Sequence, residues 1–113
     1  MKVEKPWGHE IRWAINDKYL GKILYIKEGH RLSKQYHEIK DETIYVLKGK
    51  LQVFTGPKDI ELHLPEGSAL RIKPKEIHRF SAGLGSDVEL IEVSTPEIED
   101  VIRLEDDYDR KEG

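Results

Sequence analysis

The stretch GHRLSKQYHEIKDETIYVLKG, residues Gly29–Gly49, decides the fold because it places polar side chains at the intervals of a β-strand. Side chains two apart on a strand point the same way, so Gln35 and His37 are expected to face one barrel interior. Glu42 can return on the next strand, and His78 can arrive from a more distant one. Two imidazoles, a carboxylate and an amide oxygen that converge there would make a divalent metal site.

Short strands punctuated by Gly and Pro turns run through most of the chain, at a spacing of about ten residues that is typical of a β-sandwich or barrel. The sequence predicts an all-β, single-domain jelly roll. The segment Pro96–Arg110 shows no alternation, and its acidic start predicts one short C-terminal helix. The expected strands are Glu10–Asn16, Leu20–Lys27, Thr43–Lys48, Leu51–Thr55, Ile60–Leu64, Ser68–Ile72, His78–Ser81 and Val88–Ser94.

The length of 113 residues accommodates one domain, with an N-terminal arm over 1–9, a barrel over 10–94 and a C-terminal segment over 95–113. Hydrophobic residues make up 37% and charged residues 36%, which is polar but not disordered. A core this small is often supported by a subunit interface, so we expect a homodimer. Trp7 and Trp13 are expected to serve core or interface packing.

The composition excludes several classes of partner and ligand. A net charge of −3 without a basic stripe argues against nucleic acid. Without cysteine there is neither a disulfide nor a thiolate ligand, so a metal must be held by nitrogen and oxygen donors. The N-terminus lacks an apolar signal region, and no stretch is as long as a membrane span, so we expect a cytoplasmic protein without a membrane partner.

The spacing from Gly29 to Gly49 resembles the first motif of the cupin family, Gly-x5-(His/Gln)-x-His-x4-Glu-x6-Gly. The second cupin motif is degraded here: Gly67 and His78 are in place, the proline is displaced to Pro74, and Lys75 stands where the family has its second glycine. The resemblance implies a cupin fold. It also implies that the metal ligands are Gln35, His37, Glu42 and His78.

Further blocks resemble the cupin domain of type II phosphomannose isomerases. They are Lys5-Pro6-Trp7-Gly8 with Glu10, Leu32–His37, Ile91-Glu92-Val93, and the tail Glu99–Arg110. Together they cover nearly the whole chain. The resemblance implies an isomerase of the mannose-6-phosphate type, acting on a sugar or sugar phosphate.

Three positions near Glu42 depart from that family. Lys40 replaces an arginine, Thr43 a histidine and Ile44 a tryptophan. These changes bear on the substrate rather than on the metal. A buried Glu42 followed by the inward residues Ile44 and Val46 would be costly unless it were paired or bound to a metal.

One divalent metal per chain is the expected cofactor. Two His, one Glu and an amide oxygen favour zinc, and manganese, iron, cobalt and nickel also suit this donor set. Gln35 is either a ligand or a hydrogen-bond partner of a metal-bound water.

An isomerase also needs a group that moves a proton and cations that hold a phosphate. Candidates for the proton transfer are Glu92, Lys34 and His30. Candidates for the phosphate are Arg79, Lys40 and Arg103.

Three hypotheses follow. The first is a metal-dependent sugar-phosphate isomerase, and the second is a non-catalytic cupin that binds a sugar or another small ligand. The third is a cupin dioxygenase, and Gln35 counts against it because those enzymes commonly have His at this position.

Overall fold

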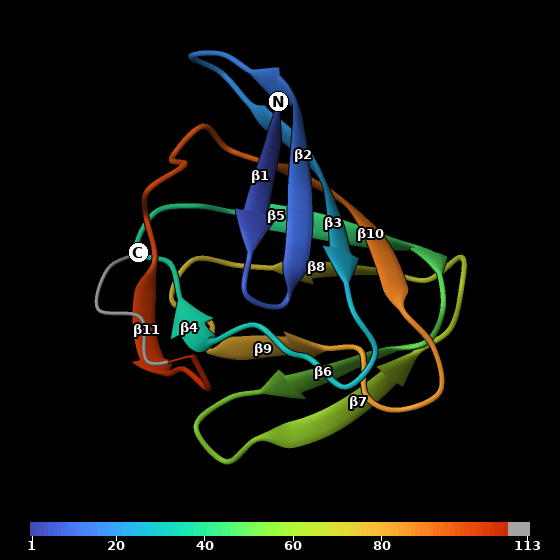
Figure 1. Cartoon of the computed structure of the whole chain (residues 1–113). Helices are drawn as coiled ribbons and strands as arrows, with labels where there is room; N and C mark the ends of the chain where they lie inside the picture. The colour runs from blue at the N-terminus through green and yellow to red at the C-terminus, as the bar shows by residue number, and fades with distance from the viewer. Residues whose placement is uncertain (109–113) are drawn as a thin grey trace.

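The computed structural model describes residues 1–108 of the chain. Within them it has eleven β-strands, joined by turns and loops, and no helix (Figure 1). Within these residues, therefore, no helix is long and apolar enough to cross a membrane. The strands are β1 Lys2–Lys5, β2 Gly8–Ile15, β3 Leu20–Ile26, β4 Lys34–Tyr36, β5 Glu42–Lys48, β6 Leu51–Thr55, β7 Ile60–Leu64, β8 Ala69–Ile72, β9 His78–Ser81, β10 Val88–Ser94 and β11 Ile102–Glu105.

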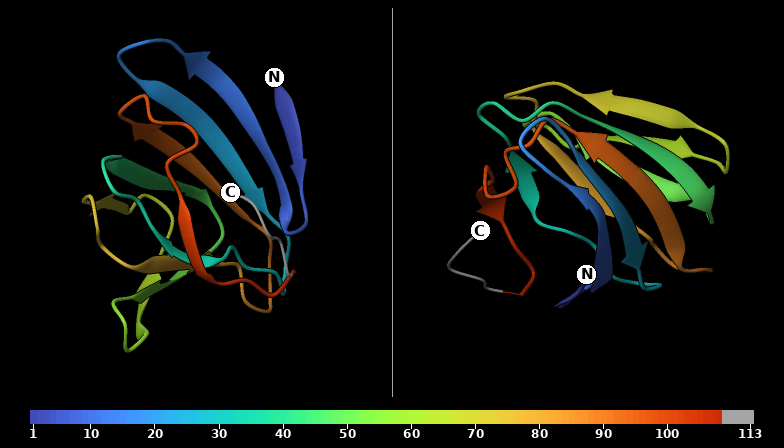
Figure 2. Two further views of the ribbon diagram at one scale, coloured as in Figure 1. Left: turned by 90° about the vertical axis from the view of Figure 1, so that its left-hand side faces the viewer. Right: turned by 90° about the horizontal axis from the view of Figure 1, so that it is seen from above.

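The strands form two antiparallel sheets that face each other (Figure 2). One has six strands in the order β1-β2-β3-β10-β5-β8, and the other has five in the order β11-β4-β9-β6-β7. The chain crosses repeatedly from one sheet to the other, which gives the jelly-roll arrangement. The predicted all-β jelly roll is confirmed.

The inner face of the six-stranded sheet changes from apolar to charged across neighbouring rows of residues. In one row Leu24, Leu90 and Val46 lie side by side and belong to the hydrophobic core. In the next row Lys22 pairs directly with Glu92. The interior is therefore a packed core at one end and a polar pocket at the other.

All eight predicted strands are present, with bounds that differ by at most two residues. The expected N-terminal arm, residues 1–9, instead forms β1 and the first residues of β2, so it belongs to the six-stranded sheet. The polar segment before His37 contains the short strand β4.

The expected short C-terminal helix is wrong for the part of the segment that is described, through Tyr108. This part contains strand β11, in which Ile102 pairs with Tyr36 and Arg103 with Gln35. The edge of β4 offers free backbone N–H and C=O groups, and pairing with them satisfies the segment without a helix. The rest of the predicted helix lies outside the described residues.

Candidate metal centre

His37, Glu42 and His78 converge in the interior, although they come from three different places in the fold. His37 follows β4, Glu42 opens β5 and His78 opens β9. Both imidazole Nε2 atoms lie 3.3 Å from the same carboxylate oxygen, Glu42 Oε1. All three side chains are buried, and their ligand atoms lie within 4.8 Å of one another. Three of the four predicted ligands therefore form one cluster.

The hydrogen bond made by Nδ1 of each imidazole determines its tautomer. His37 Nδ1 bonds to the backbone carbonyl of Asp100, and His78 Nδ1 bonds to that of Glu76 at 3.0 Å. A carbonyl oxygen can only accept, so each Nδ1 carries the proton and each Nε2 directs a lone pair at Glu42. Neither Nε2 has a hydrogen-bond partner among the described residues. Acceptors that face one another in this way fit a divalent cation between them.

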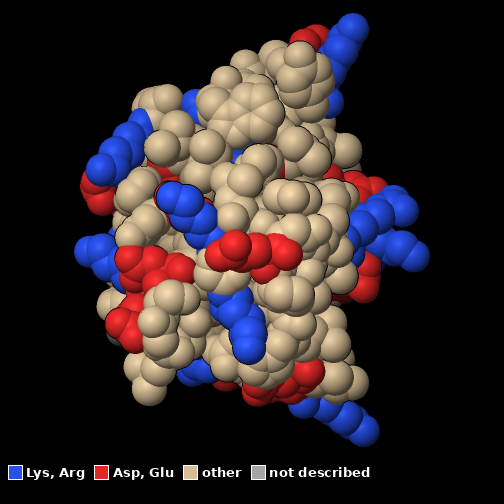
Figure 3. Space-filling model, turned by 90° about the vertical axis from the view of Figure 1, so that its right-hand side faces the viewer, with Lys and Arg blue, Asp and Glu red and all other residues tan. Residues whose placement is uncertain are grey.

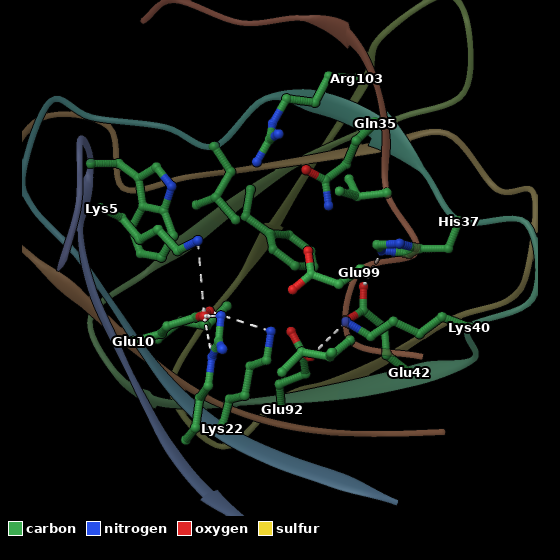
Figure 4. Close-up of a pocket in the computed structure, with 17 residues that line it drawn as sticks. Lys5, Glu10, Lys22, Gln35, His37, Lys40, Glu42, Glu92, Glu99 and Arg103 are labelled. Carbon is green, nitrogen blue, oxygen red and sulfur yellow. Dashed lines mark hydrogen bonds and ion pairs between the residues drawn. The ribbon is translucent and has the colours of Figure 1, made fainter. Parts of the chain in front are cut away.

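Gln35 lies next to this cluster, where its side chain lines the same pocket (Figure 4). Its backbone pairs with that of His78 across β4 and β9, and its Oε1 accepts a hydrogen bond of 2.7 Å from Ser33. The two roles expected of Gln35, metal ligand or partner of a bound water, both remain predictions.

The charge of Glu42 suits a metal ligand. Burial raises the pKa of this carboxyl, but the Nε2–H groups that His37 and His78 offer it when they carry a second proton in place of a metal, and the ammonium of Lys40, outweigh burial and hold the pKa well below its usual range. The site therefore keeps a carboxylate without a metal. A divalent cation would find two neutral imidazoles and one anion, a donor set common in proteins.

Asp100 ties the C-terminal segment to the turn that joins the first two ligands. Its carboxylate accepts the backbone N–H groups of Glu38 at 3.1 Å, Ile39 at 2.8 Å and Lys40 at 2.9 Å. Burial raises the pKa of Asp100, but these three N–H groups outweigh it and lower the pKa. Since the Asp100 carbonyl also holds His37, one residue orients both the ligand and the turn behind it. The sequence analysis noted the tail but not this role.

Glu92 and Lys40 form the part of the polar pocket next to the candidate ligands. Lys40 Nζ lies 3.0 Å from Glu92 Oε2 and 3.7 Å from Glu42 Oε2, and all three side chains are buried. Burial, and then the charge of Glu42, raise the pKa of Glu92 to about 7. Burial lowers the pKa of Lys40, but Glu92 and Glu42 outweigh it and raise that pKa. Glu92 is thus a carboxyl that can exchange a proton near neutral pH beside a permanently charged lysine.

The far end of the pocket holds a second charged cluster, centred on Glu10, that the sequence analysis missed. Its carboxylate lies 2.9 Å from Arg12, 3.4 Å from Lys22 and 4.0 Å from Lys5 (Figure 4). Burial raises the pKa of Glu10, but these cations outweigh it and lower the pKa. Three cations around one carboxylate leave this end positive. The sequence signal for this cluster was the alternation of the charged residues Glu10 and Arg12 with the apolar residues Ile11 and Trp13.

Of the remaining sequence candidates, only Arg103 lines the pocket. Lys34, His30 and Arg79 lie outside its lining and contact the C-terminal segment instead. Lys34 Nζ lies 3.4 Å from Glu105, His30 Nδ1 lies 2.7 Å from the Tyr108 hydroxyl, and Arg79 donates to Asp107 at 3.0 Å. On their strands, Lys34 alternates with the pocket residue Gln35, and Arg79 lies between the candidate ligand His78 and the pocket residue Phe80, so the pleat turns both cations away.

The three departures from the family pattern fall in different environments. Ile44 belongs to the hydrophobic core, and Thr43 is not part of the pocket lining. Lys40 lines the pocket. Among these three positions, only Lys40 can change what the pocket binds by direct contact.

Comparison with known proteins agrees with this geometry. A family model described as mannose-6-phosphate isomerase C-terminal matches residues 1–106. The chain belongs to this family. The resemblance inferred from the sequence blocks is therefore confirmed.

Two curated relatives match nearly the whole length of this chain. The chain is 31% identical over 112 residues to the xanthan biosynthesis protein XanB of Xanthomonas campestris pv. campestris (strain B100), covering 96% of this chain and 24% of XanB. It is 30% identical over 112 residues to the alginate biosynthesis protein AlgA of Pseudomonas aeruginosa, covering 96% of this chain and 23% of AlgA. The chain thus spans about a quarter of the length of these relatives.

Solved structures with low sequence identity share the cupin fold. KdgF from Halomonas sp. superposes with a TM-score of 0.75 at 19% identity, covering 86% of this chain and 88% of KdgF. A double-stranded β-helix protein from Klebsiella pneumoniae gives a TM-score of 0.73 at 18% identity, covering 83% of each chain. CapF from Staphylococcus aureus gives 0.79 at 18% identity, covering 93% of this chain and 34% of CapF. The chain therefore has the double-stranded β-helix fold of these structures.

Proposed function

We propose that this cupin is a metal-dependent aldose–ketose isomerase that acts on a sugar phosphate of the mannose 6-phosphate type. The observation that carries the proposal is the placement of Glu92, a carboxyl with a pKa of about 7, in the pocket that is also lined by His37 and Glu42 of the ligand cluster. Membership of the mannose-6-phosphate isomerase C-terminal family supports the reaction class.

In the proposed reaction Glu92 takes a proton from C2 of the open-chain aldose and returns it to C1. The hydroxyl proton on O2 moves to O1, so the product is the ketose and no atom is gained or lost. A pKa near 7 leaves Glu92 able both to accept and to donate a proton at neutral pH. A bound divalent metal, for which we propose zinc, would polarise the sugar oxygens and stabilise negative charge.

The cluster around Glu10 supports a phosphorylated substrate. Lys5, Arg12 and Lys22 lie at the end of the pocket away from the ligand cluster, and with Glu10 they leave a net positive charge (Figure 4). Charge-assisted hydrogen bonds from such cations are the ordinary means of holding a phosphate. We assign the phosphate to this end, in place of the cations suggested by the sequence.

Lys40 serves as a positioning residue in this proposal. Its ammonium lies between Glu92 and Glu42, at 3.0 and 3.7 Å from their oxygens. It therefore limits the repulsion between the two carboxylates while Glu92 gives up and regains its proton.

A non-catalytic sugar-binding cupin is the second candidate. The Lys40–Glu92 ion pair favours it, because the lysine holds one oxygen of the carboxylate that the reaction needs. Such a protein would bind the same sugar phosphate and leave the C2 proton in place.

The deciding experiment follows mannose 6-phosphate by NMR in D₂O with metal-loaded protein. The expected result is formation of fructose 6-phosphate, with deuterium appearing at the carbon that receives the proton. Glu92→Gln should abolish exchange at C2 and retain metal, whereas His78→Ala should lose stoichiometric metal in elemental analysis.

Three outcomes separate the hypotheses. Metal-loaded protein that binds several sugar phosphates without exchanging the C2 proton is the non-catalytic cupin. Dioxygen uptake by an iron-loaded sample would favour a cupin dioxygenase. A Glu92→Gln variant with full activity would remove Glu92 from the reaction.

A further inference from the structure

Glu99 is the pocket carboxylate that the fold leaves without a partner. Four glutamates line the pocket, and within residues 1–108 only the side chain of Glu99 makes neither a hydrogen bond nor an ion pair. The other three, Glu10, Glu42 and Glu92, are each held by a cation or by imidazoles. Glu99 can therefore bond to a ligand in the pocket without giving up an existing contact.

The direction of the Glu99 side chain distinguishes it from an ordinary surface carboxylate. Figure 3 shows the usual arrangement on one face of the molecule, where acidic groups lie among lysine and arginine side chains. Glu99 is also an exposed residue, but its side chain reaches into the cavity (Figure 4). In that view its carboxyl group lies between those of Gln35 and Glu92. It is directed at the space that a substrate would occupy.

The backbone around Glu99 is held in place from both sides. Its carbonyl accepts the N–H of Val101 at 3.0 Å, and the N–H of Asp100 donates to the carbonyl of Glu97 at 3.4 Å. The backbone carbonyl of Asp100 also orients His37. The residue that positions a candidate metal ligand is thus the next residue in the chain, so the placement of Glu99 is coupled to that of the metal centre.

The proposed isomerisation moves two protons, and Glu92 accounts for one of them. The proton on carbon passes from C2 to C1 by way of Glu92. The hydroxyl proton has to leave O2 and reach O1. Because Glu92 holds the carbon proton from the first step to the last, it cannot carry the hydroxyl proton in between. The reaction needs a second group for that transfer.

The two protons also move in different directions, which suits groups on different walls of the pocket. The proton on carbon leaves perpendicular to the plane of C1, C2 and their oxygens, whereas the hydroxyl proton moves within that plane. Glu92 rises from strand β10, and Glu99 comes from the C-terminal segment that precedes β11. The two oxygens of a carboxylate can face O1 and O2 at once, since these are neighbours on the open chain.

We propose that Glu99 carries the hydroxyl proton of this reaction, an inference that rests on the proposed function. After Glu92 has taken the proton from C2, Glu99 takes the proton from O2 as C2–O2 becomes the carbonyl, and then donates it to O1. Glu92 returns its own proton to C1. The C2–H and O2–H bonds break, the C1–H and O1–H bonds form, and both carboxyl groups end as they began.

The test compares Glu99→Gln with the wild type, both loaded with metal and given mannose 6-phosphate in D₂O. Glutamine keeps the size of the side chain and an oxygen that accepts hydrogen bonds, but it cannot take up a proton. Glu105→Gln is the matched control, because Glu105 belongs to the same segment, lies outside the pocket lining and contacts Lys34. Elemental analysis verifies that each variant keeps the wild-type metal content.

The expected result separates exchange from isomerisation. In Glu99→Gln the formation of fructose 6-phosphate should slow by roughly 10²–10⁴-fold, with KM within about twofold of the wild type. Deuterium should still accumulate at C2 of mannose 6-phosphate, because Glu92 continues to exchange that proton. Glu105→Gln should retain both rates. A merely structural role of Glu99 would not change the ratio of C2 exchange to product formation.

The contrary outcomes are distinct. If Glu99→Gln isomerises within about threefold of the wild type, the inference is overturned and the proposed function stands. A rise in KM alone overturns it too, because Glu99 then binds substrate without moving a proton. Equal losses of exchange and isomerisation also overturn it, since the variant has then disturbed the whole site. Wild-type protein that binds mannose 6-phosphate without exchanging the C2 proton refutes the proposed function, and the role of Glu99 with it.

Discussion

Removal of the Asp100 side chain is expected to loosen the turn that joins two candidate metal ligands, His37 and Glu42. The carboxylate accepts three consecutive backbone N–H groups, from Glu38, Ile39 and Lys40, at 2.8 to 3.1 Å. In Asp100→Ala these groups lose their acceptor, whereas the backbone carbonyl that holds His37 remains. The substitution therefore perturbs the position of His37 without deleting a ligand.

The size of the effect follows from those bonds. A hydrogen bond to a charged group contributes roughly 1.5–3 kcal/mol, and water can replace part of it where the turn is exposed. We expect the free energy of unfolding of metal-free Asp100→Ala to fall by about 2 kcal/mol rather than by the full sum. Loss of a group that orients a ligand lowers metal affinity by about 10–100-fold.

Urea unfolding in the presence of a chelator measures the stability, and competition with a chromophoric chelator measures the metal affinity. Asp107→Ala is the matched control. Asp107 fastens the same segment through Arg31 at 2.6 Å and Arg79 at 3.0 Å, and within residues 1–108 none of its hydrogen bonds reaches the ligand turn. Asp107→Ala should lose stability and keep the wild-type metal affinity.

Two results would refute the reasoning. If Asp100→Ala binds metal as tightly as the wild type, the turn does not position His37. If both variants lose affinity equally, the effect comes from general loosening of the C-terminal segment.

Three further predictions test other parts of the structure. The pKa of Glu92 is about 7 in the folded chain against an ordinary 4.5, so the folded chain keeps a proton that the unfolded chain releases. The stability of the metal-free protein should therefore fall as the pH rises from 4.5 to about 7, and Glu92→Gln should flatten this slope in urea unfolding. Lys75 has a φ of 70°, and a left-handed conformation costs a non-glycine residue about 1–2 kcal/mol. Lys75→Gly should thus raise the melting temperature, whereas Lys75→Ala should not. Gly8→Ala would place a Cβ 1.9 Å from the Tyr25 carbonyl oxygen, so it should destabilise the protein by more than about 3 kcal/mol; a loss within about 1 kcal/mol would contradict the β2–β3 register.

The spacing of the ligands could be predicted because it depends on local geometry. Gln35 and His37 are two apart on an extended chain, so both face the interior in the structure. Glu42 begins a strand whose inward residues Ile44 and Val46 are core, which left a buried carboxylate in need of a partner. The strand boundaries could also be predicted from the sequence, because Gly and Pro mark the turns between strands.

The charged floor of the pocket could not be predicted in this way. In Glu10–Ile15, alternation separates a charged set, Glu10 and Arg12, from an apolar set, Ile11, Trp13 and Ile15. Local pattern favours burying the apolar set. The structure buries Glu10 and leaves Ile11 36% and Trp13 54% exposed, because pairing with β3 turns Glu10 and Arg12 toward the pocket. Which face of a strand meets the interior is a property of the register, and the register depends on residues far away in the chain.

The roles of Lys34, His30 and Arg79 show the same dependence on distant residues. Each is a plausible catalytic or phosphate-binding group by type, and each instead contacts the C-terminal segment. This segment has no apolar alternation of its own, so its position depends on these polar contacts and on pairing with β4. Once it is fixed, it supplies Arg103 to the pocket and the Asp100 carbonyl to His37. The three residues therefore contact the segment that shapes the site, and they do not line the pocket itself.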